Sequence, residues 1–206
     1  MRRHYFQDKA VRLPKKDRTR SVLIDGAISA VARHGIQGAS IKEIATLAGV
    51  SNGTYYNYFK TRDDVLRLAA FSVAAEITHE IAEEVADIKS GIGRIAVSTK
   101  LFIDRATMAA DWGALIVDVV HQLSDTRQNI AEHLHEDVAL AIAQDDLTDI
   151  PDRFAVHQIS CLIALAIELA IKDHDEPRIV ERTCISVLQI LGLPADRAAF
   201  AVQKYL

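Results

Sequence analysis

The chain has 206 residues, half of them hydrophobic, and a formal net charge of −4 at pH 7. This length allows one large domain or two smaller domains with buried cores, and the hydrophobic content excludes a wholly disordered chain. The charge is unevenly distributed: residues 1–66 carry +6 and the remaining residues carry −10. Because nucleic-acid binding needs only a local excess of cations, the acidic total does not exclude it for the N-terminal segment.

Residues 1–16 are rich in Arg and Lys and show little apolar periodicity, which predicts a mobile basic arm. The pattern leaves open whether this arm contacts DNA or is a solvated tail. The first residues lack the apolar core of a secretory signal, and no stretch approaches the ~18 uninterrupted apolar residues of a membrane span. Cys161 and Cys184 lie in apolar helical patterns without metal-ligand spacing, which favours reduced thiols and leaves a redox role open. We expect a cytoplasmic protein.

Two helices are predicted in the segment that follows the arm. Apolar residues recur at helical spacing over residues 17–34, and Gly35 then provides a stop. Ser40 and Glu43 form a capping-box pattern, in which the serine oxygen accepts from the Glu43 amide and the glutamate reaches back to the Ser40 amide. The second helix therefore begins at Ser40 and ends near Gly49, where a tight turn favours glycine.

A third, short helix follows the glycine turn, and a fourth begins soon after it. Ser51 is placed to cap the third helix, and residues 61–64 form another box-like helix start. Two short helices joined by a tight turn are typical of a helix-turn-helix, whose second helix enters the major groove of DNA. The sequence therefore predicts a DNA-binding module.

The second helix of this motif, from Ser51 to about Tyr58, carries groups suited to DNA. Asn52 and Thr54 lie near its entering end and have the donor and acceptor groups that base recognition uses, and Gly53 would allow close approach. Tyr56, Tyr58 and Lys60 can bond phosphate oxygens. Tyr55 and Phe59 are expected to pack inward, because the residues of a short helix cannot all face one way.

A long fourth helix is predicted from the apolar stripe between Val65 and Ile88, which would act as a lever between the module and the rest of the chain. Further helical patterns cover residues 92–109, 111–123, 126–144, 152–173 and 178–191, with a last one from about 195. Residues 152–172 and 178–191 are apolar on more than one face, so we expect them to form a four-helix bundle between two copies of the chain.

Eight histidines raise the question of a metal site. His133 and His135 lie among acidic residues but are two positions apart, so they point to different sides of a helix. A charged, solvated helix face explains them better. We predict no metal and no cofactor.

Several residues at fixed spacing together resemble the DNA-binding signature of the TetR family of bacterial transcription regulators. They are Ile44-Ala45, Ala48-Gly49-Val50-Ser51, Gly53-Thr54, Tyr56, Tyr58-Phe59-Lys60 and Leu66. The resemblance covers about residues 17–66; beyond them it extends only to a helical remainder of suitable length. It implies a homodimer whose recognition helices enter successive major grooves of a palindromic operator, and a C-terminal ligand-binding domain that controls their separation.

The resemblance also implies roles for individual residues. Those facing bases or the adjacent backbone would be Asn52, Gly53, Thr54 and Tyr56. Those holding phosphates would be Ser40, Tyr58, Lys60 and Arg62. Asn52 stands where the family more often has lysine, which leaves the base preference open. The family keeps its ligand pocket among the middle helices, where the candidates are Phe102, Met108, Trp112, Asp118 and His121.

The predicted fold is all-α. A basic arm (1–16) precedes a three-helix helix-turn-helix DNA-binding domain (17–64), joined by a long helix to a helical ligand-binding and dimerisation domain (65–206). We expect a dimeric, ligand-responsive transcription regulator, a repressor that a small molecule releases from its operator. One alternative is an architectural DNA-binding protein without an effector, which would need no cavity. The other is a helical enzyme, which no nucleophile and base pair or phosphate-binding loop supports.

Overall fold

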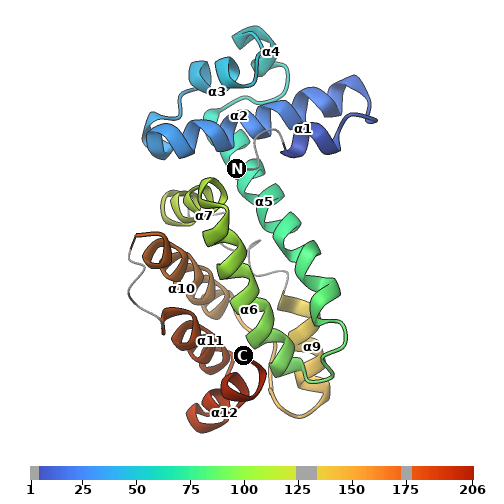
Figure 1. Ribbon diagram of the computed structural model, residues 1–206, viewed down its shortest axis with the longest axis vertical. Coiled ribbons are helices and arrows are strands. Elements are labelled where there is room, and N and C mark those ends of the chain that lie inside the picture. Colours follow the sequence, from blue (N-terminus) through green and yellow to red (C-terminus); the bar gives the residue numbers. More distant parts are fainter. Residues whose placement is uncertain (1–4, 124–133, 173–177) are drawn as a thin grey trace.

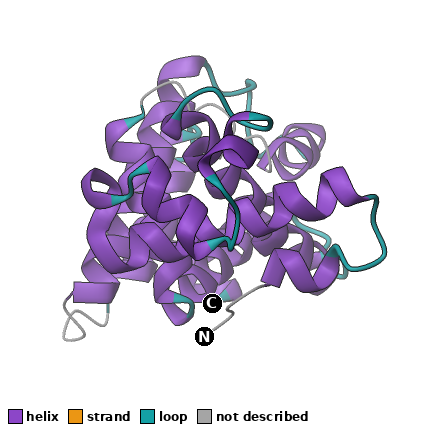
Figure 2. Ribbon diagram, turned by 90° about the horizontal axis from the view of Figure 1, so that it is seen from above, coloured by secondary structure: helices purple, strands orange, loops and turns teal. Residues whose placement is uncertain are grey.

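The computed structural model describes residues 5–123, 134–172 and 178–206, and every regular element in these ranges is an α-helix. A small N-terminal module lies at one end of a larger bundle, and one long helix, α5, belongs to both (Figure 1). Figure 2 shows the helices from above the module. The helices are α1 (Tyr5–Lys9), α2 (Lys15–Gly38), α3 (Ile41–Leu47), α4 (Asn52–Tyr56), α5 (Arg62–Val85), α6 (Gly91–Met108), α7 (Ala110–Gln122), α9 (His135–Ala143), α10 (Arg153–Lys172), α11 (Ile179–Ile190) and α12 (Ala195–Tyr205). The all-α prediction is confirmed, and residues 126–133 of the predicted 126–144 helix lie outside the described ranges.

The ends of α2 and α3 agree with the sequence in most details. Gly35 interrupts α2 with φ 64° and ψ 171°, a conformation that glycine adopts readily. The amide of Glu43 donates to Ser40 Oγ at 3.2 Å, so the serine caps α3 as predicted. The second hydrogen bond of the predicted capping box, from the Ser40 amide to the Glu43 side chain, is wrong. The Ser40 amide donates to the Gly38 carbonyl at 2.9 Å. The Glu43 carboxylate lies instead 3.4 Å from His34 Nε2.

The predicted turn and the two following caps are confirmed. Gly49 has a φ of +66°, and Ser51 Oγ accepts from the Thr54 amide at 3.0 Å at the start of α4. Thr61 and Asp64 form a complete capping box at the start of α5. Hydrogen bonding by the Thr61 backbone and hydroxyl holds the pKa of Asp64 below its ordinary value, so the carboxylate remains charged at neutral pH.

The stripe along α5 is buried, as its spacing predicts. The side chains at four-residue intervals are Val65, Ala69, Val73, Ile77, Ile81 and Val85, and none is more than 5% exposed. Burial of each valine or isoleucine side chain contributes about 1.5–3 kcal/mol relative to exposure. Because this stripe begins in the module and ends in the bundle, α5 ties the two parts together (Figure 1).

Helix α6 lies at the centre of the bundle and contacts α5, α7, α9, α10, α11 and α12. It approaches α9 very closely at Gly91, where an added Cβ would lie 2.3 Å from the Ala141 amide nitrogen. Helix α10 is long and apolar enough to cross a membrane by length and composition alone, as the core helices of soluble proteins often are, yet only 33% of its most apolar stretch is buried.

Residues 5–9 depart from the prediction of a mobile arm, because α1 packs onto the rest of the chain. The rings of Tyr5 and Phe6 lie 5.2 and 6.0 Å from the ring of Trp112. The amides of Phe6 and Gln7 donate to the buried Asp25 carboxylate at 3.2 and 2.8 Å. Local periodicity could not reveal this docking, since the aromatic partner is about a hundred residues away in the sequence.

Candidate functional site

The exposed face of α4 carries most of the residues predicted to face DNA bases. Asn52 and Gly53 are exposed, Thr54 is half-buried, and Tyr56 is 57% exposed. Tyr55 and Phe59 are buried beneath them, as predicted, whereas Tyr58, predicted to lie outside the core, packs partly against it. The helix therefore exposes polar side chains on one side, and the aromatic rings of Tyr55 and Phe59 pack into the core on the other.

The buried Tyr55 joins α4 to the start of α5. Its hydroxyl donates to the Thr61 carbonyl at 2.8 Å. Burial raises the pKa of the Tyr55 phenol, so the phenol stays protonated and remains a donor at physiological pH. The position of α4 is thus coupled directly to the capped end of α5.

The residues predicted to hold phosphates fall into two groups. Ser40 and Lys60 are exposed and Tyr58 is half-buried against the core, so all three border the surface of the module. Arg62 is turned inward: its Nη1 donates to the Ile36 carbonyl at 3.2 Å, and its Nε and Nη2 both donate to Asp63 at 3.1 Å. Arg62 thus links the start of α5 to the Ile36 backbone of α2. The resemblance to the family did not indicate this contact.

The same residue, Ile36, also contacts the bundle. Its amide donates to Asp118 Oδ2 on α7 at 3.1 Å, and the neighbouring Gln37 side chain donates to Gln122. Asp118 was predicted to line a ligand pocket; it accepts this backbone hydrogen bond at the α2–α7 interface instead. The Asp118 carboxylate, which lies in an apolar stretch of sequence, is therefore hydrogen-bonded to a backbone amide, as a partly buried polar group is expected to be.

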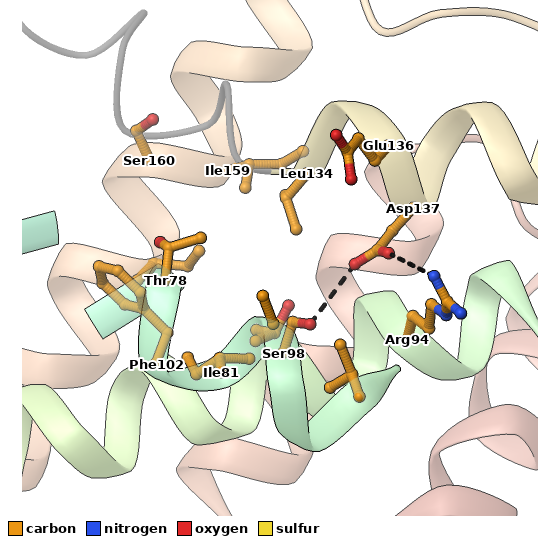
Figure 3. Close-up of a pocket in the computed structure, with 14 residues that line it drawn as sticks. Thr78, Ile81, Arg94, Ser98, Phe102, Leu134, Glu136, Asp137, Ile159 and Ser160 are labelled. Carbon is orange, nitrogen blue, oxygen red and sulfur yellow. Dashed lines mark hydrogen bonds and ion pairs between the residues drawn. The ribbon is translucent and has the colours of Figure 1, made fainter. Parts of the chain in front are cut away.

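A cavity of about 310 Å³ lies between α5, α6, α10 and the start of α9 (Figure 3). Bundle interiors are common ligand sites, and this volume is at the lower end of their usual range. The lining consists of Thr78, Ile81, Ala82, Val85, Arg94, Ser98, Thr99, Phe102, Leu134, Glu136, Asp137, Ile159, Ser160 and Ile163. Seven of these residues are apolar, and the three charged residues, Arg94, Glu136 and Asp137, belong to α6 and α9.

Only Phe102 among the five predicted pocket residues lines this cavity. Met108 is 87% exposed and, with Trp112, borders a second hollow of about 670 Å³ between α2, α5, α6 and α7. His121 is exposed. The second hollow is lined by four carboxylates and a largely exposed methionine. The first cavity has two carboxylates and seven apolar residues, so it is the better candidate for a small-molecule site. Thr78, which interrupts the apolar side of α5, was the sequence signal that could have indicated it.

The polar side of the cavity is organised around Asp137. Its carboxylate lies 3.4 Å from Ser98 Oγ and 3.9 Å from Arg94 Nη1 (Figure 3). Burial raises the pKa of Asp137, and the positive charge of Arg94 and the hydrogen bond from Ser98 only partly oppose this effect. Both contacts are long for a carboxylate, so the group retains capacity to accept a further hydrogen bond.

Neither cysteine contributes to these sites. Cys161 and Cys184 are both unpaired, and burial raises the pKa of the Cys184 thiol to about 12. Over the described ranges, which leave out His133, no group of three or more His, Cys, Asp or Glu side chains is placed to hold a metal ion.

The capped helices α3 and α4, the turn between them and the exposed polar edge of α4 define a protein of the helix-turn-helix DNA-binding class. Residues 23–69 match the family model for bacterial regulatory proteins of the tetR family. Residues 23–69 therefore carry the DNA-binding domain of this family. The predicted resemblance is confirmed.

One relative is the fatty acid metabolism regulator protein of Bacillus subtilis (strain 168), which is 41% identical over 44 residues. That match covers 21% of this chain and only 23% of the relative. The match therefore leaves most of both chains uncompared.

Solved structures resemble the whole fold. RolR in complex with resorcinol aligns with a TM-score of 0.73 and 19% identity, over 92% of this chain and 95% of that one. FadR from Bacillus subtilis in complex with stearoyl-CoA aligns with a TM-score of 0.60 and 20% identity, over 83% and 97% of the two chains. At these identities the likeness shows the shared fold.

Proposed function

We propose that this protein is a ligand-responsive transcription regulator, a repressor that binds a palindromic operator as a dimer and leaves it when a small molecule fills the α5–α6–α9–α10 cavity. The observation that carries the proposal is the extent of α5. This helix starts at the Thr61 cap, which receives the Tyr55 hydrogen bond, and its other half lines the cavity with Thr78, Ile81, Ala82 and Val85. Such a regulator would act in the cytoplasm.

Two connections link the cavity-bearing bundle to the DNA-binding module. The first is α5 itself. The second connection passes through the backbone of Ile36 on α2. Its amide donates a hydrogen bond to Asp118 on α7, and its carbonyl accepts a hydrogen bond from Arg62 at the start of α5. A ligand that prefers one position of α5 shifts the population of the module's positions, and with it the spacing of two modules in a dimer.

The direct test is selection of genomic fragments by the purified protein, followed by binding measurements with the enriched sequence. Enrichment of a short inverted repeat is expected, because each module of a symmetric dimer reads one half-site. Compounds related to the products of neighbouring genes should then reduce the affinity. Enrichment of fragments without a common sequence would instead favour an architectural DNA-binding protein.

The contacts of α4 predict two different mutational effects. Lys60→Ala should weaken binding to all duplexes alike and reduce the magnitude of the salt slope by about 1, since one phosphate contact is lost. Asn52→Ala should relax the preference at one base pair, with about 1–3 kcal/mol less discrimination. Fluorescence anisotropy at several salt concentrations, with operator and single-base variants, measures both. Unchanged binding by both variants would refute the assigned contacts.

The proposed dimer interface uses α10 and α11. Leu162, Leu165 and Leu169 follow one another at three- and four-residue spacing on α10, and the last two are 46% and 37% exposed. They border a shallow hollow shared with α11. Contiguous exposed apolar surface of this kind marks interaction sites, and two copies of the pair would form the predicted four-helix bundle.

Leu165→Glu is therefore expected to convert the dimer to a folded monomer, because the new charge would be buried only in the dimer. Sedimentation velocity at micromolar concentration measures the state, and circular dichroism checks the fold. Phe200→Glu is the matched control, since Phe200 is 66% exposed on α12, outside the proposed interface. A wild-type monomer at this concentration, or an unaffected Leu165→Glu dimer, would contradict the interface.

A further inference from the structure

Among the described residues that line it, the cavity presents more hydrogen-bond acceptors than donors. The Thr78 and Thr99 hydroxyls donate hydrogen bonds to the Ala74 and Ile95 carbonyls of their own helices, at 2.9 and 2.7 Å. Each hydroxyl has one proton and two lone pairs, so what remains is acceptor capacity. The Ser98 proton is directed to Asp137.

The cation beside the cavity does not offset this imbalance. The Arg94 guanidinium donates from Nε to the Ile88 carbonyl at 2.7 Å and from Nη2 to the Ala86 carbonyl at 2.9 Å. It is therefore committed to the segment between α5 and α6, and only Nη1 lies toward Asp137, at 3.9 Å. Its planar fork is thus not presented to the cavity for bidentate capture of an anion.

The carboxylate that dominates this side is poorly satisfied. The Asp137 side chain is 12% exposed, and its contacts with Ser98 and Arg94 are both long. A buried carboxylate that accepts few short hydrogen bonds is unfavourable. A ligand O–H or N–H that reached it would relieve this penalty, whereas a ligand carboxylate or phosphate would add repulsion from Asp137 and the neighbouring Glu136.

The size of the cavity limits the ligand further. Its volume of about 310 Å³ is roughly twice that of an engineered apolar cavity that holds one benzene molecule. One ring with a short substituent, or a short aliphatic chain, fits this space. A nucleotide-bearing thioester exceeds it and brings several negative charges.

We propose that the effector is a small apolar molecule that carries a hydrogen-bond donor, a hydroxyl or an amine, and that this donor binds Asp137 at the α6–α9 side of the cavity. The inference rests on the proposed function for the identity of the effector site. Asp137 would select ligands that carry a hydrogen-bond donor. Ile81, Phe102 and Ile163 would contact the apolar part of the ligand. Of the ligands seen in the two similar structures, resorcinol is a small donor-bearing molecule, whereas stearoyl-CoA is far larger and carries several negative charges.

The test compares four probes with one skeleton: 4-propylphenol, 4-propylaniline, propylbenzene and 4-propylbenzoate. Isothermal titration calorimetry with the wild-type chain should show the phenol, the aniline or both binding at least about tenfold more tightly than propylbenzene, the gain of a hydrogen bond to a charged acceptor. The benzoate should bind most weakly. The two donor probes distinguish a hydroxyl-bearing from an amine-bearing ligand.

Asp137→Asn should reduce the preference for the donor probes and raise the affinity for the benzoate, because the negative charge is replaced by a group that also donates. A purely structural role of Asp137 would weaken all four probes alike. Asp149→Asn is the matched control: it makes the same substitution at an exposed residue outside the cavity lining and should preserve the donor preference.

Equal affinities for the four probes, no binding of any probe, or tightest binding of the benzoate or propylbenzene would each overturn the inference. If Asp137→Asn does not fold, the wild-type series still decides. Operator binding without any probe is measured separately. Intact operator binding with no donor preference refutes this inference alone, whereas absence of sequence-specific DNA binding refutes the proposed function.

Discussion

Gly26→Ala is expected to lower the thermal stability of the protein and to reduce its DNA affinity at least tenfold. Gly26 lies where α2 crosses α3, and an added Cβ would lie 2.7 Å from the Ile44 carbonyl oxygen and 3.0 Å from the Ala48 Cβ. The obstruction includes backbone and cannot rotate away, so the helices must separate. Overpacking of this kind costs about 1–3 kcal/mol, and a shift of α3 would displace the turn that positions α4.

The matched control is Gly53→Ala, the same substitution in the same module. An added Cβ at Gly53 meets only Ser51 Oγ, at 3.7 Å, and alanine favours a helix over glycine by up to about 1 kcal/mol. Its melting temperature should therefore not fall. Its DNA affinity should still decrease if Gly53 is in close contact with DNA. A Gly26→Ala protein that melts like wild type would contradict the packing argument.

Asp118→Ala is expected to destabilise the protein by about 1–3 kcal/mol, because it leaves the amide of the buried Ile36 without its acceptor. It should also weaken operator binding, although Asp118 lies on α7, outside the helix-turn-helix. The reason is that the Ile36 carbonyl holds Arg62 at the start of α5. Chemical denaturation and anisotropy with the selected operator measure the two effects.

Asp118→Asn is the control for this prediction, because its side-chain oxygen can still accept from the Ile36 amide. It should retain most of the stability and of the operator affinity. If Asp118→Ala binds the operator as tightly as wild type at a temperature where both are folded, the connection through Ile36 does not position the DNA-binding module.

The helix-turn-helix was largely predictable because its determinants are local. Caps at Ser40, Ser51 and Thr61 act on amides three residues away, and Gly49 marks a turn by its own backbone conformation. The local pattern was less informative where a side chain had a choice of partner. Glu43 lies beside His34 instead of capping the Ser40 amide. Arg62 donates to the Ile36 carbonyl and to Asp63, and its contact with a DNA phosphate stays a prediction.

The cavity was not predictable in the same way. Of the five proposed residues only Phe102 lines it, whereas Asp137 and Arg94, which organise its polar side, carried no local signal. Trp112 belongs to the contact with α1, and Asp118 to the contact with α2. Each of these contacts depends on which helices pack against each other. Apolar periodicity indicates that one face of a helix is buried, but not which helix covers that face.

The sequence by itself determined the helices of the DNA-binding module, most of their caps and the exposure of Asn52 and Tyr56, because these follow from interactions within one or two helical turns. Only the tertiary structure decided that α1 docks on Trp112, that Ile36 joins α2 to α7 and α5, and that Asp137 faces a cavity. These features bring together residues from distant parts of the chain, and their geometry is set by how the helices pack.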